Sequence, residues 1–413
     1  MNRLPQALRG LSSNRCHPVL LSFRLLSTTA PRRRERRLPA TFYRGGTSKA
    51  LLIKRDDLPP HGAQRDAILL SAMGSPDPNG RQLDGMGGGY SSVSKVAIIG
   101  KSEQEGCDVD YEFAQVLVEK AGVDYGSNCG NMLAAVGPFA LENGLVGPHD
   151  SAGLSLVRIY NTNTRKVIHA RFPVYPGTSE ANLEGDFAID GVSGTHARIT
   201  LNFLNPEGSR TGKLFPTGNV TDTLEFGESL QATLMDCGNP CVFVSAEGFG
   251  IKPTILPAEF STDMLKRLDA LRNAAAVKMG LVKSLEEAAA KKAVPKVCIM
   301  SSKATHVVLS GATVTEEQVD VVVRCMSSGD PHRALPITAS LCTAAAAHVP
   351  GTVVHSMLRG ERVSDGIVIG HASGTIAVDA DVVKGDDGEL HVPTARVFRT
   401  ARKLFEGNVF YRA

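Results

Sequence analysis

The sequence predicts a β-rich α+β protein built from two similar halves. The 413-residue chain contains 41 glycines and no Trp, and only 5% of its residues are aromatic, which is typical of strands joined by tight turns. With 42% hydrophobic residues, the chain can bury two cores. In each half a polar turn with glycine precedes an Ala-rich helix: "SNCGNMLAAVGPFA" and "GDPHRALPITASLCTAAAAHV". This repeated order predicts a pseudo-duplicated fold that brings two helix N-termini to one central cleft, a natural place for a small polyanion.

The first 37 residues are expected to lie outside this fold. They hold nine Arg and a single acid, Glu35, so they contribute a formal charge of +8 and the rest of the chain −5. Arg residues spaced among Leu, Phe and Ser are typical of a mitochondrial transit peptide, which predicts a matrix protein. A disordered basic tail is the alternative. The acidic remainder argues against nucleic-acid binding, and no apolar run approaches the ~18 residues that cross a bilayer.

Residues 38–223 form the first predicted domain. Alternating apolar residues, interrupted by glycine- and asparagine-containing turns, predict a series of strands and hairpins. Strands are expected within 38–54, 94–102, 107–119, 154–174 and 196–206, and a helix over 62–73. A second helix follows Cys129, with Asn128 or Asn131 as its predicted cap.

Residues 224–395 form the second predicted domain, and 396–413 are expected to return to the first. Residues 230–250 read as paired strands, and residues 257–292 are rich in Ala, Leu, Lys and Glu, as helices are. Two further strands and a helix over about 335–348 complete the prediction.

The cysteines do not indicate a disulfide framework or a metal site. Without the leader, seven remain, an odd and scattered set for a reducing compartment. Cys237 and Cys241 flank a Gly-Asn-Pro turn, but no second Cys/His pair at ligand spacing accompanies them. They are interpreted as structural.

Two glycine-rich stretches do not fit nucleotide loops. In "DGMGGGYSS", Tyr90 stands where the third glycine of a dinucleotide fingerprint belongs. In "GSRTGKLFPTG", Leu214 follows the lysine where a phosphate loop needs Ser or Thr. Both are interpreted as turns, with or without a ligand close to their backbone.

Two residues are candidates for acid–base chemistry. Cys129 precedes a helix whose free amides would stabilise a thiolate and also bind a carboxylate; the alternative is an ordinary buried cysteine. Lys95 lies in the apolar run "SSVSKVAII", where desolvation would lower its pKa and make it a base. An edge lysine whose amine reaches water is the alternative.

An ordered series of motifs carries a family resemblance from residue 39 to 413. They are "YRGGTSKA", "LDGMGGGYSSVSKVAII", "NCGNMLAAVGPFAL", "VRIYNTNT", "GSRTGKLFPTGN", "PHRALPITASLC", "IGHASGTI" and "FRTARKLFEGNVF". The series resembles the PrpF family, 2-methylaconitate cis–trans isomerases and related proton-shifting isomerases with the diaminopimelate-epimerase-like fold. The resemblance implies two pseudo-symmetric domains, each a β-sheet wrapped around a central helix, with the active site between them.

The same resemblance implies the roles of individual residues. Lys95 and Cys129 match the catalytic lysine and cysteine. Further positions match those near bound carboxylates: Ser48, Gly130, Asn131, Arg333, Ser373 and Gly374. Ala372 stands where the family pattern has Pro, and the turn before Arg333 is longer than usual, so the substrate pocket is expected to differ in detail.

The implied reaction removes a proton next to a C=C–COO⁻ unit and returns one elsewhere along the allylic system. It calls for no metal, flavin or pyridoxal phosphate. The implied partner is a small tricarboxylate such as 2-methylaconitate or aconitate, and a second copy of the chain is an option. Two alternatives stay open: an isomerase of an alkylcitrate-derived acid from a biosynthetic pathway, and a non-catalytic carboxylate-binding protein. A cysteine hydrolase is disfavoured because no His is identifiable as a partner of Cys129.

Overall fold

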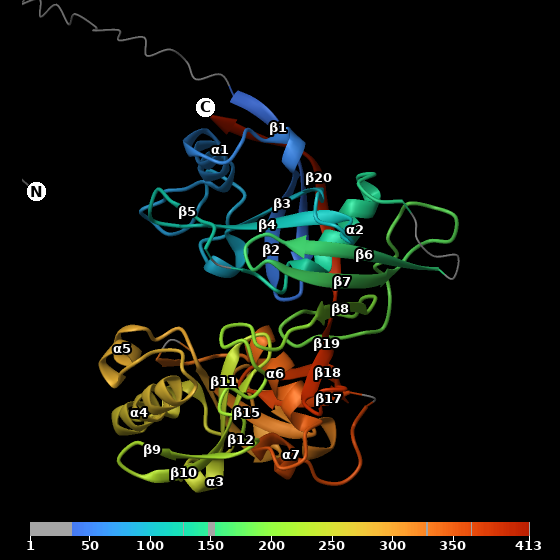
Figure 1. Cartoon of the computed structure of the whole chain (residues 1–413). Coiled ribbons are helices and arrows are strands. Elements are labelled where there is room, and N and C mark those ends of the chain that lie inside the picture. The colour runs from blue at the N-terminus through green and yellow to red at the C-terminus, as the bar shows by residue number, and fades with distance from the viewer. Residues whose placement is uncertain (1–34, 127, 148–152, 328, 365, 413) are drawn as a thin grey trace, which may run out of the picture. The chain divides into compact units, whose positions relative to one another are not determined.

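The computed structural model describes residues 35–126, 128–147, 153–327, 329–364 and 366–412 (Figure 1). The leader prediction therefore lies outside the described residues, except at its end. Strand β1 (Glu35–Gly45) begins three residues before the predicted start at Leu38. Glu35 pairs with Arg412 of β20 (Ala401–Arg412), so backbone pairing draws these charged residues into the fold.

The first lobe surrounds one buried helix, α2 (Leu133–Glu142), whose residues Leu133–Leu141 are all buried. Gly137 is required there because a Cβ would lie 2.5 Å from the Phe172 ring. Strand β20 returns from the end of the chain and pairs with β1. The other elements of this lobe are β2 (Ser48–Lys54), α1 (Ala63–Met73), β3 (Lys95–Lys101), β4 (Val109–Val116), β5 (Val123–Asp124), β6 (Leu154–Asn161), β7 (Lys166–Pro173) and β8 (Ile199–Leu204).

The second lobe repeats this plan around α6 (Ile337–Ala347), which packs against the strands of this lobe. Its small side chains allow this close packing, and Ala339–Ala347 are fully buried. The strands are β9 (Asp222–Glu225), β10 (Ser229–Asp236), β11 (Pro240–Ser245), β12 (Lys296–Ser302), β13 (His306–Val307), β14 (Thr313–Val314), β15 (Val321–Ser327), β16 (Asp330–Pro331), β17 (Ile367–His371), β18 (Gly374–Lys384) and β19 (Leu390–Arg399). The remaining helices are α3 (Ala246–Phe249), α4 (Thr262–Lys278), α5 (Leu285–Ala290) and α7 (Val353–Met357).

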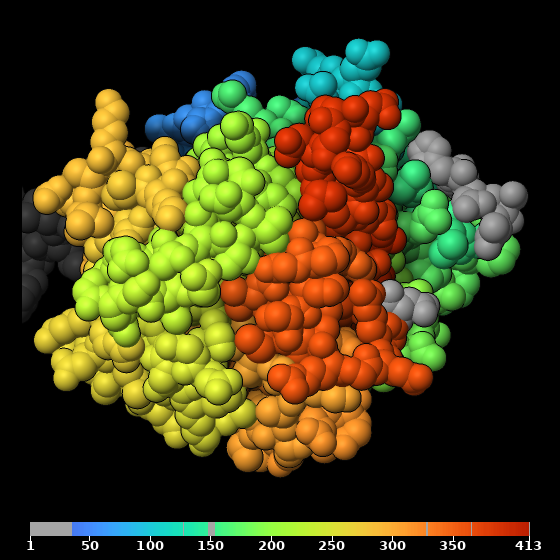
Figure 2. Space-filling view, turned by 60° about the horizontal axis from the view of Figure 1, so that its bottom comes forward, coloured from blue at the N-terminus to red at the C-terminus, as the bar shows by residue number. Residues whose placement is uncertain are grey.

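Strands β8 and β19 join the sheets of the two lobes. β8 pairs with β7 on one side and with β19 on the other, both antiparallel. β19 also pairs with β18, and the next strand along the chain is β20 of the first lobe. In the space-filling view the red C-terminal residues lie against green residues of the first lobe (Figure 2). No helix among the described residues is long and apolar enough to span a membrane.

Candidate active site

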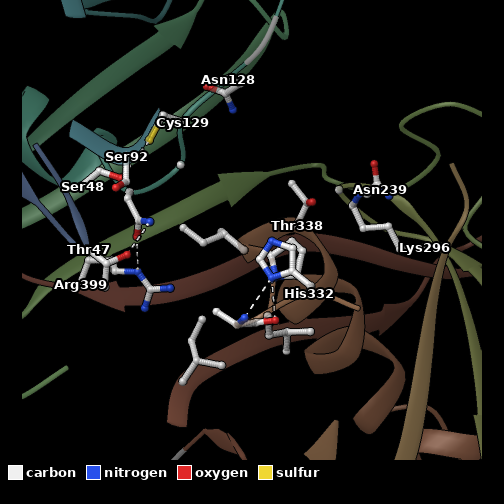
Figure 3. Close-up of a pocket in the computed structure, with 18 of the residues that line it drawn as sticks. Thr47, Ser48, Ser92, Asn128, Cys129, Asn239, Lys296, His332, Thr338 and Arg399 are labelled. Atoms are coloured by element: carbon white, nitrogen blue, oxygen red, sulfur yellow. Dashed lines mark hydrogen bonds between the residues drawn. The ribbon is translucent and has the colours of Figure 1, made fainter. Parts of the chain in front are cut away.

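A cavity of about 1090 Å³ is lined by residues of both lobes. Figure 3 shows Ser48, Cys129 and Arg399 on one side, and Asn239, Lys296, His332 and Thr338 on the other. Its charged lining is mainly cationic, because Asp190 is its single acid and is bound by the amide and hydroxyl of Thr375. The cationic side chains of the lining are Lys95, Lys166, Arg210, Lys296 and Arg399. The cavity is therefore suited to a small polyanion.

Cys129 lies on the loop ahead of α2, and 8% of its surface is exposed. Its Sγ is 3.7 Å from Oγ of Ser48, the first residue of β2. The buried hydroxyl of Tyr111, on β4, donates a hydrogen bond of 3.2 Å to the Cys129 carbonyl. Two strands thus fix the loop and leave the thiol at the cavity wall.

Lys95 is the first residue of β3 and is only 8% exposed, so it does not reach out to bulk water as an edge lysine would. Its Nζ donates a 2.6 Å hydrogen bond to Oε1 of Gln115 and lies 4.9 Å from the centre of the Phe113 ring. Among the ion pairs of the described residues, none involves Lys95. Burial lowers the pKa of Lys95, and the negative charge that Cys129 can carry opposes this shift. A lysine in this position can supply a neutral amine.

The starts of the two central helices face the same cavity, as the repeated sequence order predicts. Gly130 and Asn131 line it ahead of α2, and Ile337 and Thr338 line it at the start of α6. A Cβ on Gly130 would lie 3.0 Å from Cδ1 of Ile337, so the two segments approach closely. Neither helix has a side-chain cap, but the second and third amides of α2, those of Ala134 and Ala135, donate to the carbonyls of Asn131 and Met132. The first amides of α6 are thus the main helix amides available for an anion.

The predicted asparagine cap is wrong. Helix α2 begins at Leu133, with Met132 at the N-cap position. The Asn131 amide donates to Thr47 Oγ1 at 3.1 Å, and Asn128 accepts a hydrogen bond from Asn161. Both side chains tie the cysteine loop to neighbouring segments, the turn at Thr47 and the end of β6, and so do not cap the helix.

Arg399 is a site residue that was not predicted from the sequence. It ends β19, and only 9% of its surface is exposed. Its Nε donates to Oδ1 of Asn131 at 3.1 Å, and its Nη1 donates to the Phe398 carbonyl. Burial lowers the pKa of Arg399 to about 10, so it remains a cation at neutral pH. The only sequence signal was its place inside the motif "FRTARKLFEGNVF".

The structure brings four of the six predicted binding residues into the cavity lining: Ser48, Gly130, Asn131 and Ser373. Arg333 and Gly374 are not among the lining residues. The Arg333 side chain is exposed, and only its carbonyl contributes, by accepting a hydrogen bond from the Ser373 hydroxyl. Gly374 has a supporting role, because a Cβ there would lie 2.3 Å from the Asp190 carboxylate.

Two histidines also line the cavity from the second lobe. Nδ1 of His332 lies 2.8 Å from the Ala334 carbonyl, and Nδ1 of His371 accepts a hydrogen bond from the Ser373 amide. Burial lowers the pKa of both imidazoles, that of His371 to about 3. Both are therefore neutral near pH 7. No group of three or more His, Cys, Asp or Glu side chains in the described part of the chain is placed to hold a metal ion.

Residues 35–412 match the model of the PrpF protein family. The chain is 39% identical to 2-methyl-aconitate isomerase of Shewanella oneidensis over 389 residues, which cover 90% of this chain and 96% of that protein. It is also 39% identical to 3-methylitaconate isomerase of Eubacterium barkeri over 379 residues, 91% of this chain and 97% of the relative. The crystal structure of a methylitaconate-delta-isomerase superposes with a TM-score of 0.82 at 37% identity, covering 92% of this chain and 96% of that one.

The protein is an isomerase with the diaminopimelate-epimerase-like fold, and the fold predicted from the motifs is thereby confirmed. The chain belongs to the PrpF family. The family predicted in the sequence analysis is also confirmed.

Proposed function

We propose that this protein moves the double bond of an unsaturated di- or tricarboxylate by taking a proton from an allylic carbon and returning one elsewhere along the same system. The observation that carries this proposal is a buried lysine and a thiol at one wall of a cationic cavity. The lysine has no ion-pair partner among the described residues, and its pKa is lowered by burial. An amine of this kind is suited to act as a base near neutral pH.

In the proposed reaction, the allylic C–H bond breaks and its proton moves to Nζ of Lys95. The electron pair spreads over the C=C–COO⁻ unit as a dienolate. Uncapped helix amides and Arg399 stabilise this charge because they are already oriented before the reaction begins. Cys129 then donates its Sγ proton to the far end of the allylic system, which shifts the double bond. Exchange with water restores the neutral amine and the thiol.

The substrate candidates come from the relatives, which are named for 2-methylaconitate and 3-methylitaconate. Proton NMR of the purified protein with a panel of unsaturated acids tests them: 2-methylaconitate, cis- and trans-aconitate, and methylitaconate. In D₂O, turnover should place deuterium in the carbon skeleton of the product. Unlabelled product formed at a normal rate would contradict proton transfer through exchangeable groups. No turnover of any acid in the panel would contradict the proposed function itself.

The immediate surroundings of Cys129 do not support a cysteine hydrolase. Its Sγ lies next to the Ser48 hydroxyl, and the described residues show no hydrogen bond between Cys129 and a histidine. A catalytic thiol in a hydrolase needs such a base. A carboxylate-binding protein without activity would have no use for a buried lysine beside a thiol.

We also propose that residues 1–37 direct the protein to the mitochondrial matrix. The support is compositional, namely nine Arg with a single acid at the end of the segment. Fusion of residues 1–37 to a fluorescent reporter should send the reporter to mitochondria. A fusion in which Arg3, Arg9, Arg15 and Arg24 are replaced by Gln is the matched control and should stay cytosolic. Diffuse fluorescence from the unmodified fusion would leave only the basic-tail interpretation.

A further inference from the structure

The second lobe supplies a cation that the proposed chemistry does not use. Lys296 is the first residue of β12 and lines the cavity. Its Nζ donates a 2.7 Å hydrogen bond to Oγ of Ser327, and among the ion pairs of the described residues none includes Lys296. The side chain is partly buried. An ammonium group that is partly desolvated and not neutralised by a carboxylate is poised to bind an anion.

Two further polar side chains of the second lobe lie on the same side of the cavity as this ammonium group. Thr338, in the first turn of α6, and His332 line the same side of the cavity (Figure 3). Burial lowers the pKa of His332, and the nearby Lys296 charge lowers it further, so the imidazole is neutral near pH 7. Nδ1 of His332 lies 2.8 Å from the Ala334 carbonyl oxygen, which can only accept, so Nδ1 carries the proton of the neutral imidazole and Nε2 is an acceptor. The hydrogen-bond donor beside Lys296 is therefore the Thr338 hydroxyl.

The two sides of the cavity hold separate positive charges. Arg399 contacts Asn131 in front of α2, whereas Lys296 is carried by the second lobe on the side of α6. Lys95 is the base in the proposed reaction, so it is not counted among the groups that bind a carboxylate. A dicarboxylate that spans Arg399 and the amides beside Cys129 would leave Lys296 without a counter-charge. A third carboxylate on the substrate would supply the counter-charge of Lys296.

We propose that Lys296, with Thr338, forms a subsite for an additional carboxylate, and that this subsite makes the enzyme selective for tricarboxylates over dicarboxylates. The selectivity rests on the proposed function, because it describes the substrate of the same cavity. The subsite can nevertheless be tested without turnover, by the binding of saturated acids that contain no double bond to move.

Two saturated acids differ only in the carboxylate in question: propane-1,2,3-tricarboxylate and propane-1,2-dicarboxylate. Their affinities for the full chain are to be measured by calorimetry at one salt concentration. Wild type should bind the tricarboxylate about 10- to 100-fold more tightly, as expected for one charged hydrogen bond. Lys296→Met should remove most of this preference and leave the dicarboxylate affinity unchanged. Lys296→Arg should retain much of the preference.

Lys292→Met is the matched control, since it removes an exposed lysine near the same strand and outside the cavity lining. It should change neither affinity. Unchanged dicarboxylate binding by Lys296→Met also shows that the variant is folded. Equal weakening of both acids, or no effect on either, would overturn the subsite while leaving the isomerase proposal to its own D₂O experiment.

Discussion

The two central helices begin in equivalent places but differ in the residues that precede them. Ahead of α2 stand Cys129, Gly130 and Asn131, and Lys95 lies on a strand of the same lobe. Ahead of α6 stands His332, with Lys296 on a strand of its lobe. Both helices present uncapped N-termini to one cavity, which favours carboxylates from either side.

This difference shows how the two halves of a duplicated fold can take different roles, proton transfer and substrate binding. The shared feature is a buried helix whose N-terminus faces the cavity without a side-chain cap, and its partial positive charge favours anions on both sides. The residues that can exchange protons with carbon are gathered in the first lobe, whereas the second lobe offers neutral imidazoles and a lysine for binding. Variants of Lys95 and Cys129 should therefore fail mainly in turnover, whereas variants of the cations that bind carboxylates should fail mainly in affinity.

The largest effect is expected for Lys95→Met, which removes the base but keeps the length of the side chain. Turnover should fall at least about a hundredfold, the usual size of a lost acid–base group. The fold should survive, because Met suits the apolar surroundings of Phe113. Steady-state kinetics and circular dichroism check this. Full activity in a folded Lys95→Met protein would disprove the proposed mechanism.

Replacement of Cys129 tests the division of roles within the first lobe. Cys129→Ala should lower turnover at least about a hundredfold. Cys129→Ser, a weaker acid at the same position, should slow product formation more than it slows exchange of the substrate proton with D₂O. Mass spectrometry of recovered substrate and product measures the two rates. If both rates fell equally, the thiol would not be the group that returns the proton.

Arg399→Met should act mainly on binding, because the guanidinium holds a carboxylate and transfers no proton. KM should rise about tenfold or more, with a smaller fall in kcat. Arg333→Met is the matched control from the second lobe, since that side chain is exposed and outside the cavity lining. An equal rise in KM for both variants would mean that general charge, not the Arg399 contact, governs affinity.

The smallest change at neutral pH is expected for His371→Asn, which instead alters stability in acid. The pKa of His371 is about 3 in the folded protein and ~6.5 in an unfolded chain, so the unfolded state binds the extra proton between these values. The contribution of neutral His371 to the free energy of unfolding is therefore complete above pH 6.5 and is lost as the pH falls towards 3. Between pH 7 and pH 5, wild type should lose about 2 kcal/mol more than His371→Asn in urea unfolding. Parallel losses would show that His371 is not the group that titrates.

Sequence reasoning located the residues whose chemistry is unusual for their local pattern. Lys95 could be found because a lysine within the apolar run "SSVSKVAII" calls for an explanation, and Cys129 because it precedes a helix. Arg399 and Lys296 could not be found in this way. Lys296 begins its strand just as Lys95 does, and Arg399 ends one, so their place in a strand does not mark them, and only long-range pairing brings them to the cavity. Arg333 illustrates the converse: it stands within the motif "PHRALPITASLC", yet its side chain is exposed and outside the cavity lining.

The pairing of β1 with β20 has a consequence for engineering. Glu35 and Arg412 are direct partners across this pair, so the two ends of the folded body lie beside each other (Figure 1). A few flexible residues would suffice to join them, and new ends could then be opened in an exposed turn such as residues 103–106. Such a circularly permuted chain should fold to the same cavity. It would free both lobes for the attachment of reporters without disturbing the strand that carries Arg399.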